Sequence, residues 1–389
     1  MRTEVAIIGG GPSGLLLSRL LQRAGIESVV LERRPRAHVL SRIRAGVLEW
    51  GTVETLRRAG VGARMDAEGE VHHGTVISSG GRGVRIDFDD LVDGRVMVYG
   101  QTEVTRDLYA AHDAAGGAVI DEAEVTGAEG LERDGPVTLS YRRGGERREV
   151  TADWVAGCDG FRGVSRGLIP AGVLREFERV WPFGWLGVLT EAPPASPEVL
   201  YAHHERGFAL CSMRNPRLSR YYLQVPADED PAAWSAAAFF DELRRRVPEA
   251  VADRLEVGPV VETSVAPLRS YVAEPMRHGR LFLVGDAAHI VPPTGAKGLN
   301  LAVSDVHYLA EALTQRKAGD AEGVDGYSAR ALARVWKAER FSWWMTATLH
   351  RFPEAGPFGL RMQEAELDYL AASRAARTAL AENYVGLPF

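Results

Sequence analysis

The chain has 389 residues with a formal net charge of −6, and 25% of its residues are charged against 46% hydrophobic. This composition is typical of a globular protein, and the negative charge argues against nucleic acid or an anionic membrane as a general partner. No apolar run reaches the roughly 18 residues of a membrane span and no signal peptide precedes the first expected strand, so we expect a cytoplasmic protein.

A strand, a glycine turn and a helix open the chain in "VAIIGGGPSG" and the apolar pattern that follows it. The turn fills a G-x-G-x-x-G motif, in which the missing side chains allow a tight turn, close approach of a pyrophosphate and helix packing. The next strand, "SVVLER", ends in a carboxylate placed to accept hydrogen bonds from ribose hydroxyls. The sequence therefore predicts a dinucleotide site at Gly9, Gly11, Gly14 and Glu32.

The middle of the chain alternates helical and strand patterns. We expect a helix over 47–61, a strand-rich excursion near 71–98, and a helix from Gln101 with Thr102, Thr105 and Asp107 supplying oxygens near its start. A hairpin with a Gly-Gly turn follows in "VTLSYRRGGERREVTADWVAGCDG". Short alternating strands from Phe183 to Val225 then predict an antiparallel sheet and a second domain. The last 60 residues show helical patterns.

Two further loops indicate which dinucleotide is bound. "AGCDG" ends an apolar strand with Asp159, and "FLVGDAAH" ends another with Asp286. A carboxylate at the carboxyl end of a strand suits the hydroxyl groups of a long ligand lying across the sheet. FAD has a ribityl chain with such hydroxyls and NAD has none, so FAD is expected. Cys158 and Cys211 lack metal-ligand spacing, and no metal site is expected.

In this chain order, the three loops resemble the signature of the single-component flavoprotein aromatic hydroxylases. The resemblance extends over the whole chain, through "LERRPRAHVLSRIRAGVLE", "VYGQTEVTRDL", "RGFALCSMR", "RYYLQVP", "WKAERFSWWMT" and "AENYVGLP". These stretches resemble in particular the branch that acts on 4-hydroxybenzoate. The implied reaction uses FAD, NADPH and O2 to hydroxylate this substrate at its 3-position, in aromatic-compound catabolism.

The implied fold is α/β, with a Rossmann-like FAD-binding domain, an inserted, mostly antiparallel β-sheet substrate domain and a C-terminal helical region. The expected ranges are 1–180 for the FAD domain, 181–268 for the substrate sheet, 269–330 for the return to the FAD domain, and 331–389 for the helical region. Relatives also imply a homodimer that forms through these last helices.

The expected substrate grip lies on the strands "ALCSMR" and "SRYYLQV". Leu210, Ser212 and Arg214 alternate onto one face because side chains in a strand have a period of two. The resemblance implies that Ser212, Arg214 and Tyr222 hold the benzoate carboxylate, which an arginine can bind bidentately.

The other end of the substrate is a phenol, whose ionisation at pH 7 costs roughly 4 kcal/mol for a pKa near 10. The resemblance implies a proton relay from the substrate through Tyr201 and Tyr384 to His72 near solvent, since histidine is the natural proton terminus at neutral pH. His73 is a competing terminus. The resemblance also places Pro293, through its carbonyl, and Thr294 beside the reacting edge of the ring.

The loop "PPTGAKGLN" opens a helix, and backbone donors at a helix N-terminus favour the negative charge of a reduced flavin. Lys297 would add positive potential beside Leu299 and Asn300. The resemblance implies further FAD contacts at Gln101, Arg42, Arg44, Arg220 and Asp286.

No second strand-bounded G-x-G-x-x-G occurs for the nicotinamide, and the resemblance implies a surface groove instead. An arginine cluster suits the 2′-phosphate of NADPH. The expected groove residues are Arg33, Arg34, His38, Arg42, Arg44, Arg162 and Arg269, and Arg36 belongs to the same cluster. His38 and Arg162 stand where relatives have a tyrosine and a histidine, so NADH as well as NADPH stays open.

Three alternatives remain. "WPFGWLG" lacks the W-x-W-x-I-P spacing of flavin halogenases, which argues against that reaction. A hydroxylase of another para-substituted benzoate, such as an aminobenzoate, fits if Val199 and Trp50 reshape the pocket. A flavin-binding sensor without turnover is disfavoured by the complete set of Tyr201, Tyr384, Ser212 and Arg214.

Overall fold

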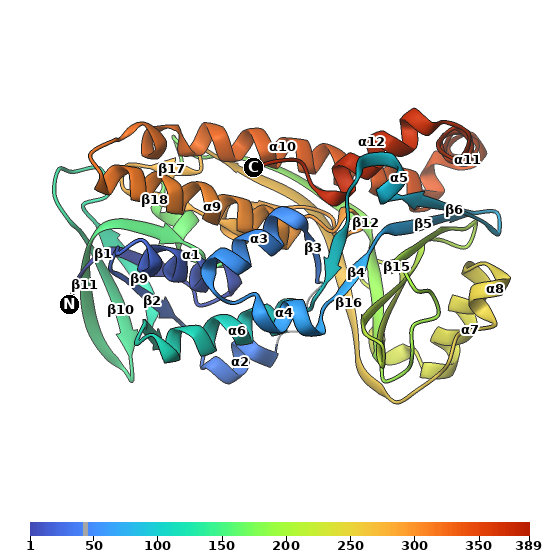
Figure 1. The fold of residues 1–389 in the computed structure, drawn as a ribbon, viewed down its shortest axis with the longest axis horizontal. Coiled ribbons are helices and arrows are strands. Elements are labelled where there is room, and N and C mark those ends of the chain that lie inside the picture. Colours follow the sequence, from blue (N-terminus) through green and yellow to red (C-terminus); the bar gives the residue numbers. More distant parts are fainter. Residues whose placement is uncertain (42–45) are drawn as a thin grey trace.

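Two β-sheets lie end to end along the molecule, and helices cover both (Figure 1). The computed structural model describes residues 1–41 and 46–389. The first sheet, the left half of Figure 1, is built mainly from the N-terminal residues, and the second, on the right, mainly from the middle of the chain. This arrangement confirms the expected α/β class with a mostly antiparallel second sheet.

The first sheet has a parallel core that begins at the N-terminus. Its strand order is β17 (Arg277–His278), β18 (Leu281–Leu283), β11 (Glu146–Gly157), β1 (Arg2–Ile8), β2 (Ser28–Glu32) and β8 (Ala118–Asp121). β10 (Val137–Arg143) and β9 (Glu124–Glu129) extend it off this path. β10 and β11 form the predicted hairpin around Gly144 and Gly145. Ile8 pairs with Leu31 and Gly157, so the carboxyl ends of three strands lie level at one edge.

The second sheet is antiparallel except where β13 pairs with β5. Its order is β19 (His289–Ile290), β16 (Val260–Glu274), β12 (Arg175–Thr190), β15 (Leu218–Pro226), β14 (Ala209–Asn215), β13 (Leu200–His203), β5 (Gly74–Ser79) and β6 (Arg82–Asp87). The strand-rich excursion near 71–98 therefore supplies two strands of this sheet. A third, small sheet combines β3 (Val47–Glu49), β7 (Val96–Val98) and β4 (Glu70–His72).

Long helices cover the first sheet. α1 (Pro12–Arg23) and α9 (Gly298–Lys317) pack together, and α10 (Glu322–Leu349) lies along α9 (Figure 1). α11 (Gly356–Ala372) and α12 (Arg374–Val385) follow at the top right of Figure 1, and α7 (Ala236–Arg246) and α8 (Glu249–Ala252) cover the far end of the second sheet. The shorter helices are α2 (Arg36–Ser41), α3 (Trp50–Ala59), α4 (Ala63–Glu68), α5 (Phe88–Val92) and α6 (Gln101–Ala114).

Two local predictions were wrong. The helix expected over 47–61 begins only at Trp50, because Val47–Glu49 pair as a strand with β7. The N-cap of α6 is Gly100, without a side-chain cap, and Thr105 instead donates to the carbonyl of Gln101 within the helix. Asp107 accepts from the Arg64 guanidinium at 2.7 Å.

The buried hydrophobic residues form three clusters, and Cys158 lies in the cluster of the first sheet while Cys211 lies in a cluster of the second sheet. Phe341 and Leu349 of α10 are buried. Within the described ranges no helix is both long and apolar enough to cross a bilayer. The same ranges contain no cluster of three potential metal ligands.

Candidate functional site

The glycine turn lies between β1 and α1, where side chains have no room. Gly9 has φ +106°, and a Cβ there would lie 2.4 Å from the carbonyl oxygen of Cys158. A Cβ at Gly14 would lie 2.0 Å from the Gly9 carbonyl oxygen, whereas a Cβ at Gly11 would meet nothing within 4 Å. Gly11 directly precedes the first turn of α1. The helix N-terminus therefore faces open space that suits a pyrophosphate.

Glu32 lies at the end of β2 beside this turn and is held by two backbone donors. Gly10 N–H donates to Oε2 at 2.7 Å and Arg34 N–H donates to Oε1 at 2.8 Å. Each carboxylate oxygen keeps a further lone pair, because an ionised carboxylate has about four acceptor positions. The carboxylate is thus oriented by the backbone and still able to accept ribose hydroxyls.

Asp159 and Asp286 lie in the loops after β11 and β18, at the same edge of the sheet. Asp159 Oδ2 accepts from Ser165 N–H at 3.0 Å, while Oδ1 is buried without a partner. Burial raises the pKa of Asp159 above its ordinary value. Asp286 is exposed although residues 281–285 and 287–289 are buried. An orphaned carboxylate oxygen and an exposed carboxylate at this edge fit the hydroxyl-rich chain of FAD.

A buried ion pair supports the second of these loops. Asp305 Oδ2 on α9 accepts from Gly285 N–H at 2.9 Å and lies 2.7 Å from His289 Nε2. Both side chains are 1% exposed. The pair fixes the backbone on each side of Asp286.

The loop before α9 carries Pro293, Thr294 and Lys297, and the first turn of α9 carries Leu299 and Asn300. Pro293 is exposed in an otherwise buried stretch, and Thr294 is fully buried with its hydroxyl accepting from Thr346 at 3.0 Å. Leu299 is half-buried in the first turn of α9.

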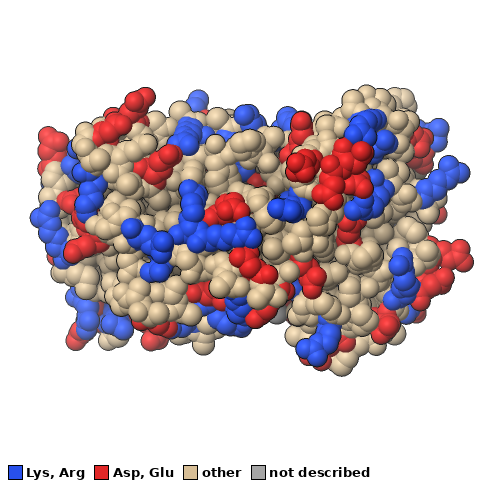
Figure 2. Space-filling model, viewed as in Figure 1, with Lys and Arg blue, Asp and Glu red and all other residues tan. Residues whose placement is uncertain are grey.

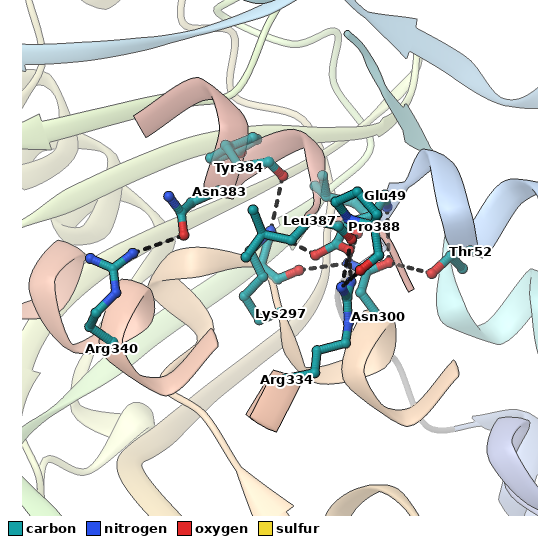
Figure 3. Close-up of polar contacts among 12 residues, drawn as sticks. Glu49, Thr52, Lys297, Asn300, Arg334, Arg340, Asn383, Tyr384, Leu387 and Pro388 are labelled. Carbon is teal, nitrogen blue, oxygen red and sulfur yellow. Dashed lines mark hydrogen bonds and ion pairs between the residues drawn. The ribbon is translucent and has the colours of Figure 1, made fainter. Parts of the chain in front are cut away.

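Lys297 and Asn300 are both occupied by protein contacts (Figure 3). Lys297 Nζ donates to Glu49 Oε1 at 2.7 Å and to the Tyr384 carbonyl at 3.0 Å. The Asn300 amide donates to the Val47 and Ala296 carbonyls and accepts from Glu49 N–H and the Thr52 hydroxyl. Four hydrogen bonds use the full capacity of an amide, so only the backbone of Asn300 is free for a flavin.

The expected acid-binding residues share one face of the second sheet. Leu210 pairs with Tyr222 on β15 and with Tyr201 on β13, and Ser212 pairs with Arg220. Directly paired residues point to the same side. The face therefore presents Tyr201, Ser212, Arg220 and Tyr222 together, and Arg214, at the register shift of β14, interacts with Tyr222.

Arg214 is a half-buried cation without a carboxylate. In the part of the chain that the structure describes, its Nε has no partner and its Nη1 reaches only the Met213 carbonyl at 3.3 Å. Burial lowers the pKa of Arg214, and the neighbouring Tyr222 raises it. Burying a charge without a counter-ion is costly, so this position favours an anionic ligand.

Ser212 on β14 contacts the backbone of β15, and the side chain of Arg220 on β15 contacts β16. Ser212 Oγ donates to the Arg220 carbonyl at 2.9 Å, so its hydroxyl must rotate to donate to a ligand. Arg220 Nη2 donates to Ser264 Oγ at 3.1 Å, and Arg220 lies 3.2 Å from Glu262. Arg220 is thereby fixed 5.0 Å from the Tyr222 ring.

Tyr201 and Tyr384 form the hydroxyl pair that the relay requires, with their oxygens 3.0 Å apart. Both residues are at most 2% exposed, and burial raises the pKa of Tyr384 to about 12. The Thr75 hydroxyl lies beside this pair and donates to the Val199 carbonyl at 2.8 Å.

The expectation that His72 lies near solvent was wrong. His72 is 4% exposed, neither ring nitrogen has a partner within the described residues, and burial lowers its pKa. His73 is the exposed histidine, and its Nδ1 lies 2.9 Å from Asp89. His72 is the last residue of β4, whereas His73 follows at a bend before β5, where its side chain is exposed. Two buried ring nitrogens without partners among the described residues suit a bound water.

Three of the expected nicotinamide residues, Arg33, Arg162 and Arg269, lie around the loop after β11. Arg33 Nη1 lies 3.5 Å from the Arg162 carbonyl, and Arg269 lies 4.5 Å from the ring of Phe161 and 3.0 Å from Glu178. Arg34 and His38 are exposed nearby in the chain, and Gln101 is half-buried at the start of α6. Arg36 turns away and forms two hydrogen bonds with Asp113. Arg42 and Arg44 lie outside the described residues.

Sequence reasoning missed Glu49 and Arg334, which are both buried at the centre of Figure 3. Arg334 Nη2 donates to Glu49 Oε2 at 2.7 Å. A glutamate that ends the apolar strand "VLE" was the available signal, because an acidic residue is rarely buried without a partner. Nothing in the sequence identified a partner 285 residues away.

Comparisons with known proteins agree with this geometry. The family model described as "FAD binding domain" matches residues 2–342. A p-hydroxybenzoate hydroxylase from Acinetobacter baylyi is 50% identical over 100% of this chain and 96% of its own length. A rifampicin monooxygenase from Streptomyces venezuelae is 27% identical over 87% of this chain and 68% of its own length.

Solved structures share the fold. A p-nitrophenol 4-monooxygenase from Pseudomonas putida superposes with a TM-score of 0.81 at 22% identity, covering 100% of both chains. An anhydrotetracycline hydroxylase from Streptomyces rimosus gives a TM-score of 0.77 at 24% identity, covering 100% of this chain and 77% of the other.

Proposed function

Because the chain belongs to the p-hydroxybenzoate hydroxylases, a family of FAD-binding monooxygenases, we propose that it converts 4-hydroxybenzoate, O2 and a reduced nicotinamide to 3,4-dihydroxybenzoate, water and the oxidised nicotinamide. The observation that carries this proposal is the face of the second sheet. A guanidinium without a carboxylate partner among the described residues stands on β14, and on the neighbouring strand β13 the Tyr201 hydroxyl pairs with the hydroxyl of Tyr384 on α12.

Binding orients the ring from its acid end. Arg214 supplies two parallel N–H donors, Tyr222 and Ser212 supply hydroxyls, and a charge-assisted contact is worth about 1.5–3 kcal/mol. Because Arg214 has no carboxylate of its own among the described residues, the substrate completes an ion pair and does not have to displace one.

The tyrosine pair accepts the phenol proton. Tyr201 accepts from the substrate hydroxyl and donates to Tyr384, which passes a proton toward His72 through water. A phenolate directs electron density to its ortho carbon, the atom that is hydroxylated. Burial keeps both tyrosines protonated at neutral pH, so they transfer the proton and do not retain the charge.

We assign FAD to Gly9, Gly11, Gly14 and Glu32 at the first turn and to Asp159 and Asp286 at the following loops. When bound and reduced, FAD supplies the activation of O2. The resemblance adds Gln101, Arg220 and Leu299 as contacts. Lys297 and the first turn of α9 supply positive potential near Pro293 and Thr294.

NADPH is the proposed reductant, bound at Arg33, Arg34, His38, Arg162 and Arg269. Exposed arginines suit its 2′-phosphate, and NADH remains a second candidate because His38 and Arg162 depart from the family pattern. We also propose a cytoplasmic homodimer. Exposed Phe358, Met362 and Tyr369 on α11 are apolar enough for a subunit contact.

The competing substrate is 4-aminobenzoate. Oxygen uptake by the FAD-loaded protein should be compared with 4-hydroxybenzoate, 4-aminobenzoate and benzoate, each with NADPH and with NADH. We expect stoichiometric 3,4-dihydroxybenzoate only with the first ring and faster turnover with NADPH. If the flavin-containing protein oxidised the nicotinamide no faster with any of these aromatic acids than without them, it would instead be a sensor.

A further inference from the structure

A buried ring of polar contacts joins the C-terminal tail to the site (Figure 3). It starts at Arg334 on α10, which donates to Glu49 Oε2 at 2.7 Å. Glu49 Oε1 accepts from Lys297 at 2.7 Å, and Lys297 donates to the Tyr384 carbonyl at 3.0 Å. Arg334 Nη1 closes the ring by donating to the carbonyls of Leu387 and Pro388 at 2.5 and 3.1 Å.

All three charged side chains in this ring are buried, with side-chain exposures of 4% for Lys297, 5% for Glu49 and 9% for Arg334. Each hydrogen bond of the ring joins two of its own members, so removing one member leaves buried groups unpaired. Arg334 Nε, which takes no part in these contacts, is buried without a partner among the described residues. Such loss is far more disruptive than loss of a surface ion pair.

The tail itself is shaped for this contact. Gly386 has φ +106°, and a Cβ there would lie 2.3 Å from Glu49 Oε2. Phe389 lies 4.7 Å from the Arg334 guanidinium and 5.1 Å from the His307 ring. The last four residues therefore pack between α9 and α10, directly after the helix that carries Tyr384.

We propose that Arg334 is a positioning residue for the proton relay: it fixes Glu49 and the tail, and through them the backbone of Tyr384, so that the two tyrosine hydroxyls stay within hydrogen-bonding distance. The inference rests on the proposed function. Among residues 1–41 and 46–389, the hydrogen bonds of Arg334 go to Glu49, Leu387 and Pro388, so Arg334 acts on the relay through Glu49, Lys297 and the tail.

A lysine cannot replace this arginine. The Arg334 fork reaches Glu49 with one nitrogen and two carbonyls with another, whereas an ammonium is a compact point charge without that geometry. Arg334→Lys keeps the net charge of the cluster and removes the fork. Gly386→Ala changes no charge and pushes a methyl group against Glu49.

Two matched controls are available. Arg340 is also on α10 and donates to Asn383 at 3.0 Å, next to Tyr384, but this contact is exposed and lies outside the ring (Figure 3). Gly319 has φ +99°, close to that of Gly386, and a Cβ there would meet nothing within 4 Å. Arg340→Gln therefore makes the same chemical change as Arg334→Gln, and Gly319→Ala imposes the same backbone strain as Gly386→Ala. Neither control residue belongs to the ring.

The experiment uses the FAD-loaded full chain and two readouts. The first is the fraction of bound 4-hydroxybenzoate present as phenolate at pH 8, from near-ultraviolet difference spectra without turnover. The second is product formed per nicotinamide oxidised. We expect Arg334→Gln, Arg334→Lys and Gly386→Ala to lower both at least threefold, and both controls to match the wild type.

If Arg334→Lys gave wild-type values of both readouts and only Arg334→Gln lowered them, the charge of residue 334 alone would explain the effect, and the positioning role would be refuted. Wild-type values in all three ring variants, or equal losses in the controls, would also overturn it. If Arg334→Gln does not fold, Gly386→Ala with Gly319→Ala decides. A wild-type protein without 4-hydroxybenzoate-dependent oxygen uptake would refute the proposed function, which separates that failure from this one.

Discussion

Glu339 offers a test of the buried electrostatics that is independent of catalysis. This residue of α10 is 5% exposed, and its Oε1 has no partner among the described residues. Burial raises the pKa of the carboxyl from 4.5 to about 7, partly opposed by Ser270 and by His289. The folded state therefore binds more protons than the unfolded state between these two values. Its stabilising effect is complete below pH 4.5 and is lost as pH rises through 7.

Glu339→Gln removes this dependence, because an amide stays neutral. The pKa of the carboxyl differs by about 2.5 between the folded and the unfolded state. At about 1.36 kcal/mol per pKa unit, this difference corresponds to about 3 kcal/mol of unfolding free energy. We expect the variant to gain about that much free energy of unfolding relative to the wild type between pH 4.5 and pH 8. Urea unfolding of both proteins at several pH values measures it, and Glu382→Gln, an exposed position on α12, is the control. A variant-minus-wild-type difference that is constant with pH would refute the reasoning.

Four further outcomes are expected. Arg214→Ala should raise KM for 4-hydroxybenzoate at least about a hundredfold, since two charge-assisted contacts are lost; a KM within threefold would contradict the acid-binding role. Tyr201→Phe should slow hydroxylation by roughly 10²-fold or more while nicotinamide oxidation continues, measured as hydrogen peroxide released per turnover; full coupling would reject the relay. Glu32→Gln should weaken FAD binding by about tenfold or more in a fluorescence titration, and unchanged affinity would remove the ribose contact. Burial lowers the pKa of His350 to about 3, so the folded state binds fewer protons than the unfolded state and stability falls as pH drops from 6.5 towards 3. The free energy of unfolding of His350→Gln should therefore fall less than that of the wild type over this pH range. An equal fall in both proteins would contradict the lowered pKa of His350.

The sequence by itself determined the parts of this protein that depend on short-range patterns. The first strand, the glycine turn, the helix and Glu32 at the end of the next strand follow from local spacing. Residues close together in the sequence determine both the glycine turn and the point at which the strand ends. Strand periodicity likewise placed Ser212 and Arg214 on one face before any partner strand was known. The family resemblance then supplied roles that spacing alone does not give.

Only the tertiary structure decided which groups are buried and what they meet. Periodicity could not say which of His72 and His73 faces inward, because that depends on the neighbouring strands β5 and β7. Lys297 was expected to add positive potential beside the flavin. In the structure its ammonium group donates to Glu49, which lies 248 residues away in the sequence. Arg334 gave no signal at all, since an arginine on a helix is ordinarily solvated. Long-range burial determines its partners, and burial is a property of the folded chain that local sequence does not encode.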